Sequence, residues 1–161
     1  MASLSVGKKN KTGDEWFTPK SAFQDIAHLI SKDKVIWEPF YGNGSSGKYL
    51  TELGFEVIHE PLDFFEQTNF DYDIIVSNPP FSKKIAIFKH LAKLDKPFIL
   101  LVPVSIITKQ YLKKYFKDKV QIIIPKSRIH FLKNGQAGTG CWFDTIFIAY
   151  RMNLEKDITY L

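Results

Sequence analysis

The residues best suited to chemistry are Asn78, Pro79, Pro80 and Phe81, which directly follow an apolar run expected to form a strand, Ile74–Ser77. Two consecutive prolines cannot donate to a strand ladder, and Asn78 before a proline is pushed into an extended conformation. This stiff corner would offer the Asn78 side-chain oxygen and the Pro79 carbonyl to one amino group, with Phe81 stacked on the ring that carries it. The same tetrapeptide also fits an ordinary strand-to-helix turn with a core phenylalanine.

A second candidate site is the turn 39–47, between an expected strand at 35–38 and an expected helix that ends near Gly54. Strand, glycine turn and helix is a layout that seats a ligand at a helix N-terminus. Three sites fit the turn. It resembles a phosphate loop, although Tyr49 stands where Ser or Thr would hold the metal; its G-x-G-x-x-G spacing fits a dinucleotide; and the acid, aromatic and glycines fit the nucleoside and methionine pocket of a methyltransferase.

Acidic residues follow the second expected strand, 56–60. Glu60 is placed to bind the two hydroxyls of a ribose, or is simply an exposed strand-end acid. Asp63 could accept a hydrogen bond from an exocyclic amine, with Phe64 against the base. The alternative is a helix cap beside two core phenylalanines.

Upstream of the glycine turn lie Trp16, Phe17, Thr18 and Pro19. Thr18 is expected to be a helix N-cap and Pro19 the first residue of the helix that follows. The two aromatic residues before the cap fit a hydrophobic staple.

The rest of the chain alternates between helical and strand patterns, with a helix at 83–94, an apolar strand at 97–102, a helix at 108–116 and strands at 120–124 and 141–150. We therefore predict a doubly wound, mostly parallel α/β sheet whose last strand is antiparallel. The glycine-rich loop before that strand is either a plain hairpin loop or a substrate-contacting loop. Lys126 and Arg128 lie nearby and could hold phosphates.

Composition limits the function classes. The 161 residues predict one domain, flanked by a mobile basic arm at 1–13 and a C-terminal tail at 151–161. The net charge of +5 mildly favours a polyanionic partner. One cysteine, no apolar segment of membrane-spanning length and no signal-peptide pattern predict an intracellular protein. The four histidines show no metal-ligand spacing, so no metal is expected.

Taken in chain order, Phe17–Pro19, Glu38–Gly44, Asp63–Phe65 and Ser77–Phe81 resemble the amino-methyltransferases that use S-adenosylmethionine. The order is similar to that of the N6-adenine DNA methyltransferases of the gamma arrangement, especially the small phage or viral type. The resemblance covers roughly residues 14–150 and implies a Rossmann-like methyltransferase domain there. It implies DNA as the substrate, with RNA adenine, a protein glutamine or a non-catalytic scaffold subunit as alternatives.

The resemblance also implies roles for individual residues. The target base would be held by Asn78, Pro79, Pro80 and Phe81. S-adenosylmethionine would be held by Trp16, Phe17, Thr18, Pro19, Glu38, Pro39, Phe40, Gly42, Gly44, Glu60, Asp63, Phe64 and Asn78.

Two departures from the family pattern affect these expectations. About a dozen residues separate Glu60 from Asp73, so the third strand should be missing or vestigial. No stretch is long enough for a separate target-recognition domain. Sequence specificity is therefore expected to be low, or to come from a partner or a homodimer mate.

Overall fold

The computed structural model describes residues 17–66, 69–133, 136–137 and 143–161. Within these ranges no helix is long and apolar enough to cross a membrane. The elements in chain order are α1 (Lys20–Ile26), η1 (Ala27–Leu29), β1 (Val35–Trp37), α2 (Ser45–Glu52), β2 (Glu56–Ile58), β3 (Ile74–Ser77), η2 (Phe81–Lys83), α3 (Lys84–Leu94), β4 (Phe98–Pro103), η3 (Val104–Thr108), α4 (Gln110–Phe116), β5 (Val120–Ile124), β6 (Leu132–Lys133), β7 (Gln136–Ala137), β8 (Thr145–Tyr150) and β9 (Ile158–Tyr160).

Seven strands form one sheet in the order β2-β1-β3-β4-β8-β5-β9. Strand β8 runs antiparallel to both of its neighbours, and the other pairs are parallel. This confirms the predicted doubly wound, mostly parallel α/β sheet. Across the described residues no strand lies between β2 and β3, so β2 is an edge strand and the third strand is missing, as the short spacing predicted.

Two details of the chain end were predicted wrongly. Strand β9 pairs in parallel with β5, with Ile122 opposite Ile158, so residues 151–161 contribute an edge strand rather than a free tail. The antiparallel strand β8 is consequently the penultimate strand, not the last. The pattern gave little warning because β9 has only three residues and two of them, Ile158 and Tyr160, are exposed.

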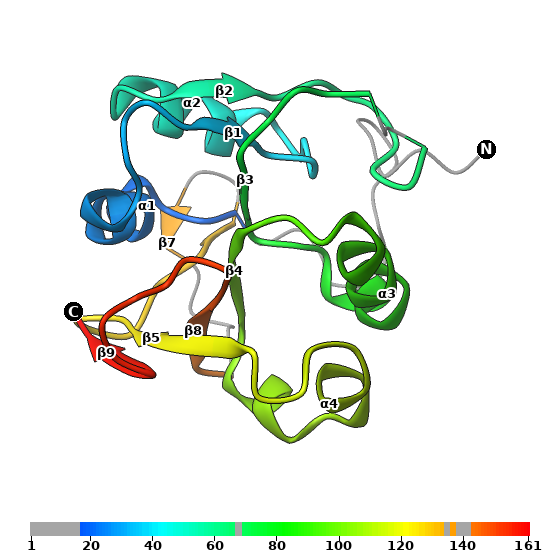
Figure 1. Cartoon of the computed structure of the whole chain (residues 1–161). Coiled ribbons are helices and arrows are strands. Elements are labelled where there is room, and N and C mark those ends of the chain that lie inside the picture. Colours follow the sequence, from blue (N-terminus) through cyan, green and yellow to red (C-terminus); the bar gives the residue numbers. More distant parts are fainter. Residues whose placement is uncertain (1–16, 67–68, 134–135, 138–142) are drawn as a thin grey trace.

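Side chains alternate between the two faces of the sheet, which places a core on each side. Ile74 and Val76 pack with α1 and α2, while Ile75 packs with α3 and α4. The central strand β4 divides in the same way and is buried at every position, as expected for a strand covered on both faces. Figure 1 shows α1 and α2 on one side of the sheet and α3 and α4 on the other.

The first helix begins one residue later than predicted. Thr18 is not the N-cap: Pro19 holds that position, with extended backbone angles, and Lys20 is the first helical residue. The reason is tertiary. Phe17 forms two backbone hydrogen bonds with Leu132, which keep the chain extended up to the helix and turn Thr18 into the interior.

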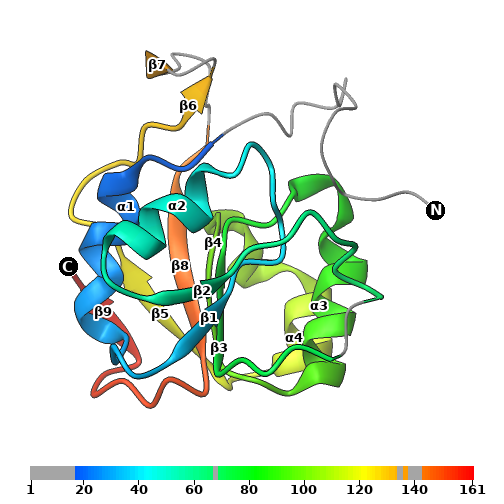
Figure 2. The same ribbon diagram turned by 90° about the horizontal axis from the view of Figure 1, so that it is seen from above.

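The order in which strands are added to the sheet reverses after β2. From β1 the chain moves outward to β2, and it then returns to form β3 on the other side of β1. In open α/β sheets, ligands bind beside the carboxyl ends of the strands at such a switch point. Figure 2 shows the turn after β1 and the turn after β3 next to each other at the same end of the sheet.

We predict that stability depends strongly on the central strand. Leu100 in β4 is completely buried, so Leu100→Ala should lower the free energy of unfolding by about 2–5 kcal/mol. Leu62 is 42% exposed, and Leu62→Ala is the matched control with an expected change below about 1 kcal/mol. Urea unfolding followed by circular dichroism measures both. Equal losses for the two variants would contradict the packing described here.

Candidate active site

A buried carboxyl group joins the two turns at the switch point. Glu38, directly after β1, is 1% exposed. Its Oε1 atom accepts hydrogen bonds from the hydroxyl of Ser77 at the end of β3 and from the backbone N–H of Phe40, the latter at 2.9 Å. The sequence motif around Glu38 and the motif that begins at Ser77 are therefore in direct contact.

Burial also changes the acidity of this carboxyl group. It raises the pKa of Glu38 to about 8, against the opposing effect of the hydrogen bonds from Ser77 and Phe40. At neutral pH the group is therefore mostly a neutral acid in the absence of ligands. A positively charged ligand beside it would favour ionisation, because opposite charges stabilise each other at low dielectric.

Asn78 follows Ser77 and carries the most distinctive polar atom of the site. Its side-chain oxygen is buried and has no hydrogen-bond partner within the described part of the chain. Pro79 behind it is buried as well, and Pro80 is extended, so the corner is held from within the fold. A buried acceptor without a partner costs free energy, roughly 1–3 kcal/mol, and such a cost is typical of an atom that binds a ligand.

The aromatic ring of this corner, Phe81, is half-buried and opens the short helix η2. It packs edge-on against Phe143, with ring centroids 5.1 Å apart, and the ammonium group of Lys84 lies 5.5 Å from its centre. The ring is thus packed nearly perpendicular to that of Phe143, with the Lys84 ammonium group over its face. This arrangement suits stacking against a flat, electron-rich base.

In the glycine turn, two glycines adopt conformations that other residues rarely take. Gly42 has φ of 57° and Gly44, the N-cap of α2, has φ of 83°. A Cβ atom on Gly42 would lie 3.3 Å from the ring of Phe17, so the predicted upstream motif does reach the turn. The hydroxyl of Thr18 is buried and also has no partner among the described residues.

The third glycine has a different role, which the sequence did not reveal. A Cβ atom on Gly47 would lie 1.9 Å from Nδ1 of His59, so the imidazole occupies the space that a side chain would fill. The His59 ring also packs on Tyr41, with centroids 4.6 Å apart. Burial lowers the pKa of His59, partly offset by the carbonyls of Phe40 and Tyr41 and by Glu60. A neutral histidine therefore braces the turn.

This geometry does not support the phosphate-loop interpretation. Lys48, which would have to reach a phosphate, is well exposed and lies 3.9 Å from Glu52, one helical turn further along α2. The N–H group of Ser45 at the start of α2 is already capped by the side chain of Asn43, at 3.0 Å. In the described residues no group of three or more His, Cys, Asp or Glu side chains could hold a metal ion.

The predicted adenine site is only partly as expected. Phe64 is completely buried and packs against Trp37 and Phe40, so its ring has no free face for a base; that prediction was wrong. The reason is that the segment after β2 folds back over one face of the sheet, where Phe64 packs against Trp37 of β1 and His90 of α3. Asp63 accepts a hydrogen bond from the N–H of Phe65 at 2.8 Å and so holds a local turn. In the described residues no helix begins directly after Asp63, so it is not the helix cap considered as its alternative.

Two residues beside Asp63 are better placed than Phe64 to meet a ligand. Phe65 is only half-buried, and its ring packs edge-on against His90 of α3, with centroids 5.5 Å apart. The Nε2 atom of His90 is buried and lacks a partner in the described ranges. Burial lowers the pKa of His90 and keeps it neutral. His90 was not predicted, because it comes from a helix far away in the sequence.

The remaining predicted residues lie near the same edge or outside the described chain. Glu60 is exposed two residues after β2. Lys126 and Arg128 follow β5 and form surface ion pairs with Asp25 at 3.7 Å and with Asp144 at 3.5 Å. Trp16, the basic arm at 1–13 and most of the glycine-rich loop lie outside the described residues.

Comparison with known proteins bears on the fold. No family model and no curated protein matches the chain. A solved class I S-adenosylmethionine-dependent methyltransferase from Listeria monocytogenes is 14% identical with a TM-score of 0.57, over 94% of this chain and 67% of that one. A dimethyladenosine transferase from Plasmodium falciparum is 11% identical with a TM-score of 0.51, over 83% of this chain and 62% of that one. The chain has the fold of class I methyltransferases and spans about two thirds of the length of these two structures.

We predict that the Glu38 carboxyl makes stability depend on pH. In the unfolded chain the group loses its proton near pH 4.5 and in the folded chain near pH 8. As pH rises between these values, only the unfolded state releases the proton, so the folded state loses stability. Relative to Glu38→Gln, the wild type should lose on the order of 3 kcal/mol of unfolding free energy from about pH 5 to pH 9.

Urea unfolding of both proteins at several pH values measures this difference. Glu38→Gln is the appropriate reference because it keeps the shape and hydrogen-bonding capacity of a neutral acid. Parallel pH profiles for the two proteins would show that Glu38 ionises normally.

Proposed function

We propose that this chain is an S-adenosylmethionine-dependent methyltransferase that acts on the N6 amino group of adenine in DNA. The observation that carries the proposal is the buried, unpartnered side-chain oxygen of Asn78 at the carboxyl end of β3, beside the glycine turn. The class I methyltransferase fold agrees with it. So does the name of one protein with this fold, a dimethyladenosine transferase, which points to adenosine as the acceptor in that protein.

The residues of the turn fit the cofactor. Thr18 offers a buried hydroxyl without a partner in the described chain, and the left-handed conformations of Gly42 and Gly44 let the backbone approach a ligand closely. We assign the methionine end to these residues and the ribose to Glu60. The adenine ring is assigned to Asp63 with Phe65 and His90, in place of the buried Phe64.

When bound, S-adenosylmethionine supplies an electrophilic methyl group, so that the N6–methyl bond forms as the methyl–sulfur bond breaks, a thioether remains and one amino proton passes to solvent. The chain must make N6 a better nucleophile, because its lone pair is delocalised into the ring. Hydrogen bonds from the amino group to Asn78 Oδ1 and to the Pro79 carbonyl favour the pyramidal form of the nitrogen. They strengthen as positive charge develops there, so they act mainly in the transition state.

The rest of the corner positions the acceptor. Phe81, held edge-on by Phe143, stacks on the adenine ring and fixes its distance from the methyl group. In duplex DNA the base has to leave the stack, at a cost of a few kcal/mol, and stacking on Phe81 offsets about 1–3 kcal/mol of it. The phage or viral type of enzyme remains the proposed relative of this chain.

RNA adenine is the second candidate acceptor. The corner around Asn78 recognises an amino group and a flat ring, which DNA and RNA share, and nothing among the described residues selects against a 2′-hydroxyl. A protein glutamine shares only the amide and would leave the ring of Phe81 without a stacking partner. A basic chain with net charge +5 also favours a nucleic acid.

The test is incubation of the purified chain with labelled S-adenosylmethionine and DNA, RNA and protein acceptors, followed by identification of the methylated product. We expect N6-methyladenine in DNA. Asn78→Ala should lower the rate of methyl transfer by about 100-fold or more, while cofactor binding measured by calorimetry stays within a few-fold. Asn69→Ala, the same change at an exposed asparagine, is the matched control and should leave the rate unchanged.

Two results would contradict the proposal. A product on a glutamine side chain would move the enzyme to another substrate class. Cofactor binding without methyl transfer to any acceptor, alike in wild type and Asn78→Ala, would indicate a scaffold subunit.

A further inference from the structure

A hollow of about 560 Å³ lies between α3 and α4 and is not used by the site described above. It is lined by Ile85, Gln110, Tyr111, Lys113, Lys114 and Tyr115. Both helices start at the carboxyl edge of the sheet, and Ile85 follows Phe81 by four residues, about one helical turn. The Ile85 end of the hollow therefore lies about one helical turn along the chain from the residue proposed to stack on the target base.

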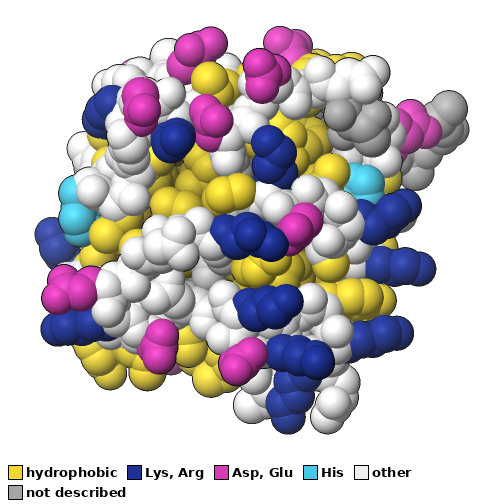
Figure 3. Space-filling view, viewed as in Figure 1, with side chains coloured by type: hydrophobic (Ala, Val, Ile, Leu, Met, Phe, Trp, Pro, Cys, Tyr) yellow, Lys and Arg dark blue, Asp and Glu magenta, His cyan; other side chains and the backbone are white. Residues whose placement is uncertain are grey.

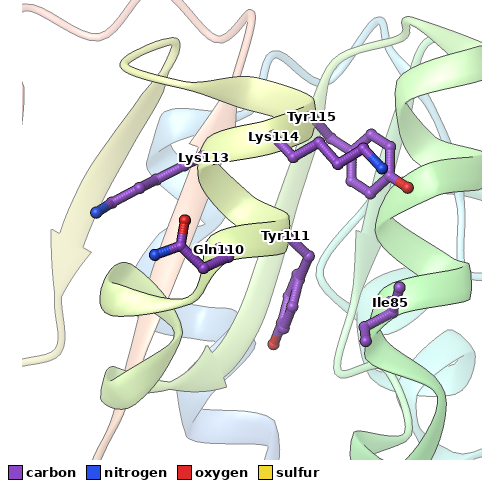
Figure 4. A pocket seen from close by; sticks show the side chains of 6 residues that line it. All are labelled: Ile85, Gln110, Tyr111, Lys113, Lys114 and Tyr115. Carbon is purple, nitrogen blue, oxygen red and sulfur yellow. The ribbon is translucent and has the colours of Figure 1, made fainter.

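The hollow has an apolar wall that is unusual on a helix surface. Ile85 is 62% exposed, although it points toward α4 rather than standing alone. Figure 4 shows the rings of Tyr111 and Tyr115 projecting from α4 toward α3, facing the side of Ile85, while Gln110 and Lys113 stand on the other flank of α4. Aromatic and aliphatic side chains arranged in this way leave a gap suited to a flat ring.

A polar atom within this wall lacks a partner. The hydroxyl of Tyr111 is buried and has no hydrogen-bond partner in the part of the chain that the structure describes. Its ring is fixed by Phe88 of α3, with centroids 5.5 Å apart. Since buried tyrosine hydroxyls normally find a partner, a ligand with a polar edge would satisfy it.

The charge around the hollow is predominantly positive, with Asp118 just after α4 as an exception. Residues 78–117 contain a single carboxylate, Asp95, and nine lysines: Lys83, Lys84, Lys89, Lys93, Lys96, Lys109, Lys113, Lys114 and Lys117. Asp95 lies at the opposite, C-terminal end of α3 and is engaged by Arg151 at 3.0 Å. In the described chain no carboxylate lies within ion-pair distance of Lys113 or Lys114. Figure 3, which views the other end of the strands, shows mostly Lys and Arg side chains on the side of α3 and α4, whereas acids gather near α2 and β2 and also occur near β5 and β9.

We propose that this hollow binds the nucleotide next to the target adenine in the acceptor strand, with its base against Ile85 and Tyr111 and its phosphate at Lys114. The strand then crosses α4, so that the following phosphate meets Lys113 on the other flank of the helix. The inference rests on the proposed function, because it extends the binding surface of that same site. An acidic peptide would satisfy the lysines but would leave the flat apolar wall and the Tyr111 hydroxyl unused. A nucleotide uses all three features, and the Ile85 end of the hollow lies about one helical turn along the chain from Phe81.

Such a contact would add to the affinity for the acceptor strand and to its selection by sequence. A flipped adenine held by Asn78 and Phe81 alone would be bound without regard to its neighbours. A second base in the hollow would fix the path of the strand and add affinity of roughly 1–3 kcal/mol from stacking. It would also make the nucleotide beside the adenine the first position at which this chain could distinguish sequences.

The test measures binding of the full chain to a fluorescent single-stranded oligonucleotide with one adenine, by anisotropy at several salt concentrations. Lys113→Gln with Lys114→Gln should weaken binding about 10-fold at low salt and lower the salt slope by about 1.4, or 0.7 for each phosphate contact. The control, Lys34→Gln with Lys156→Gln, removes the same charge from exposed residues beside β1 and β9 at the other edge, and should change affinity less than two-fold. Tyr111→Phe keeps the ring and should weaken binding about three-fold.

Deoxyribo- and ribo-oligonucleotides of the same sequence are compared. The inference is supported if the Lys113/Lys114 variant loses affinity for either one while the Lys34/Lys156 control does not. Equal losses in the lysine variant and its control, or competition by a polyglutamate peptide as strong as that by unlabelled oligonucleotide, would overturn it. Methyl transfer to free deoxyadenosine, which is too short to reach the hollow, should be unchanged in the lysine variant. If methyl transfer persists and the lysine variant and its control bind the oligonucleotide equally well, only the assignment of the hollow is refuted. If no acceptor is methylated, the proposed function is refuted.

Discussion

The hydrogen bond between the Ser77 hydroxyl and the buried carboxyl group of Glu38 is the constraint on which the site depends. It ties the end of β3 to the end of β1 at the switch point, where the strand order of the sheet reverses. The same oxygen of Glu38 orients the N–H of Phe40 at the start of the glycine turn. One buried acid thus fixes the distance between the turn that faces the proposed cofactor and the corner that carries Asn78.

Polar atoms without partners surround this constraint. The Asn78 oxygen, the Thr18 hydroxyl and Nε2 of His59 and of His90 are all buried and unpartnered within the described residues. Thr18, His59 and Asn78 flank the two turns at the switch point, and His90 packs on the segment after β2; the hydroxyls of Tyr72 and Tyr111, also unpartnered in the described chain, lie elsewhere. Groups that cost stability when unpaired are typical of places where a ligand pairs them, so these atoms support the proposed site more strongly than any one motif does.

Much of the fold could be predicted because its causes are local. Ile74–Ser77 and the run that forms β4 are apolar throughout, which marks buried central strands, and the prolines after β3 end it at the predicted residue. The missing third strand followed from chain length alone. What failed involved long-range contacts: Phe17 pairs with Leu132 and displaces Thr18 from its expected cap, and β5 recruits the last residues as β9.

By itself, the sequence determined the local shape of the corner at Asn78 and of the glycine turn. Prolines and glycines set the backbone conformation there without help from distant segments. Only the tertiary structure decided which side chains share the site. It buried Phe64 against Trp37 and Phe40, and it brought His59 against Gly47 and His90 toward Phe65. The physical reason is that backbone geometry depends on neighbouring residues, whereas burial depends on what packs from distant segments, which no local pattern records.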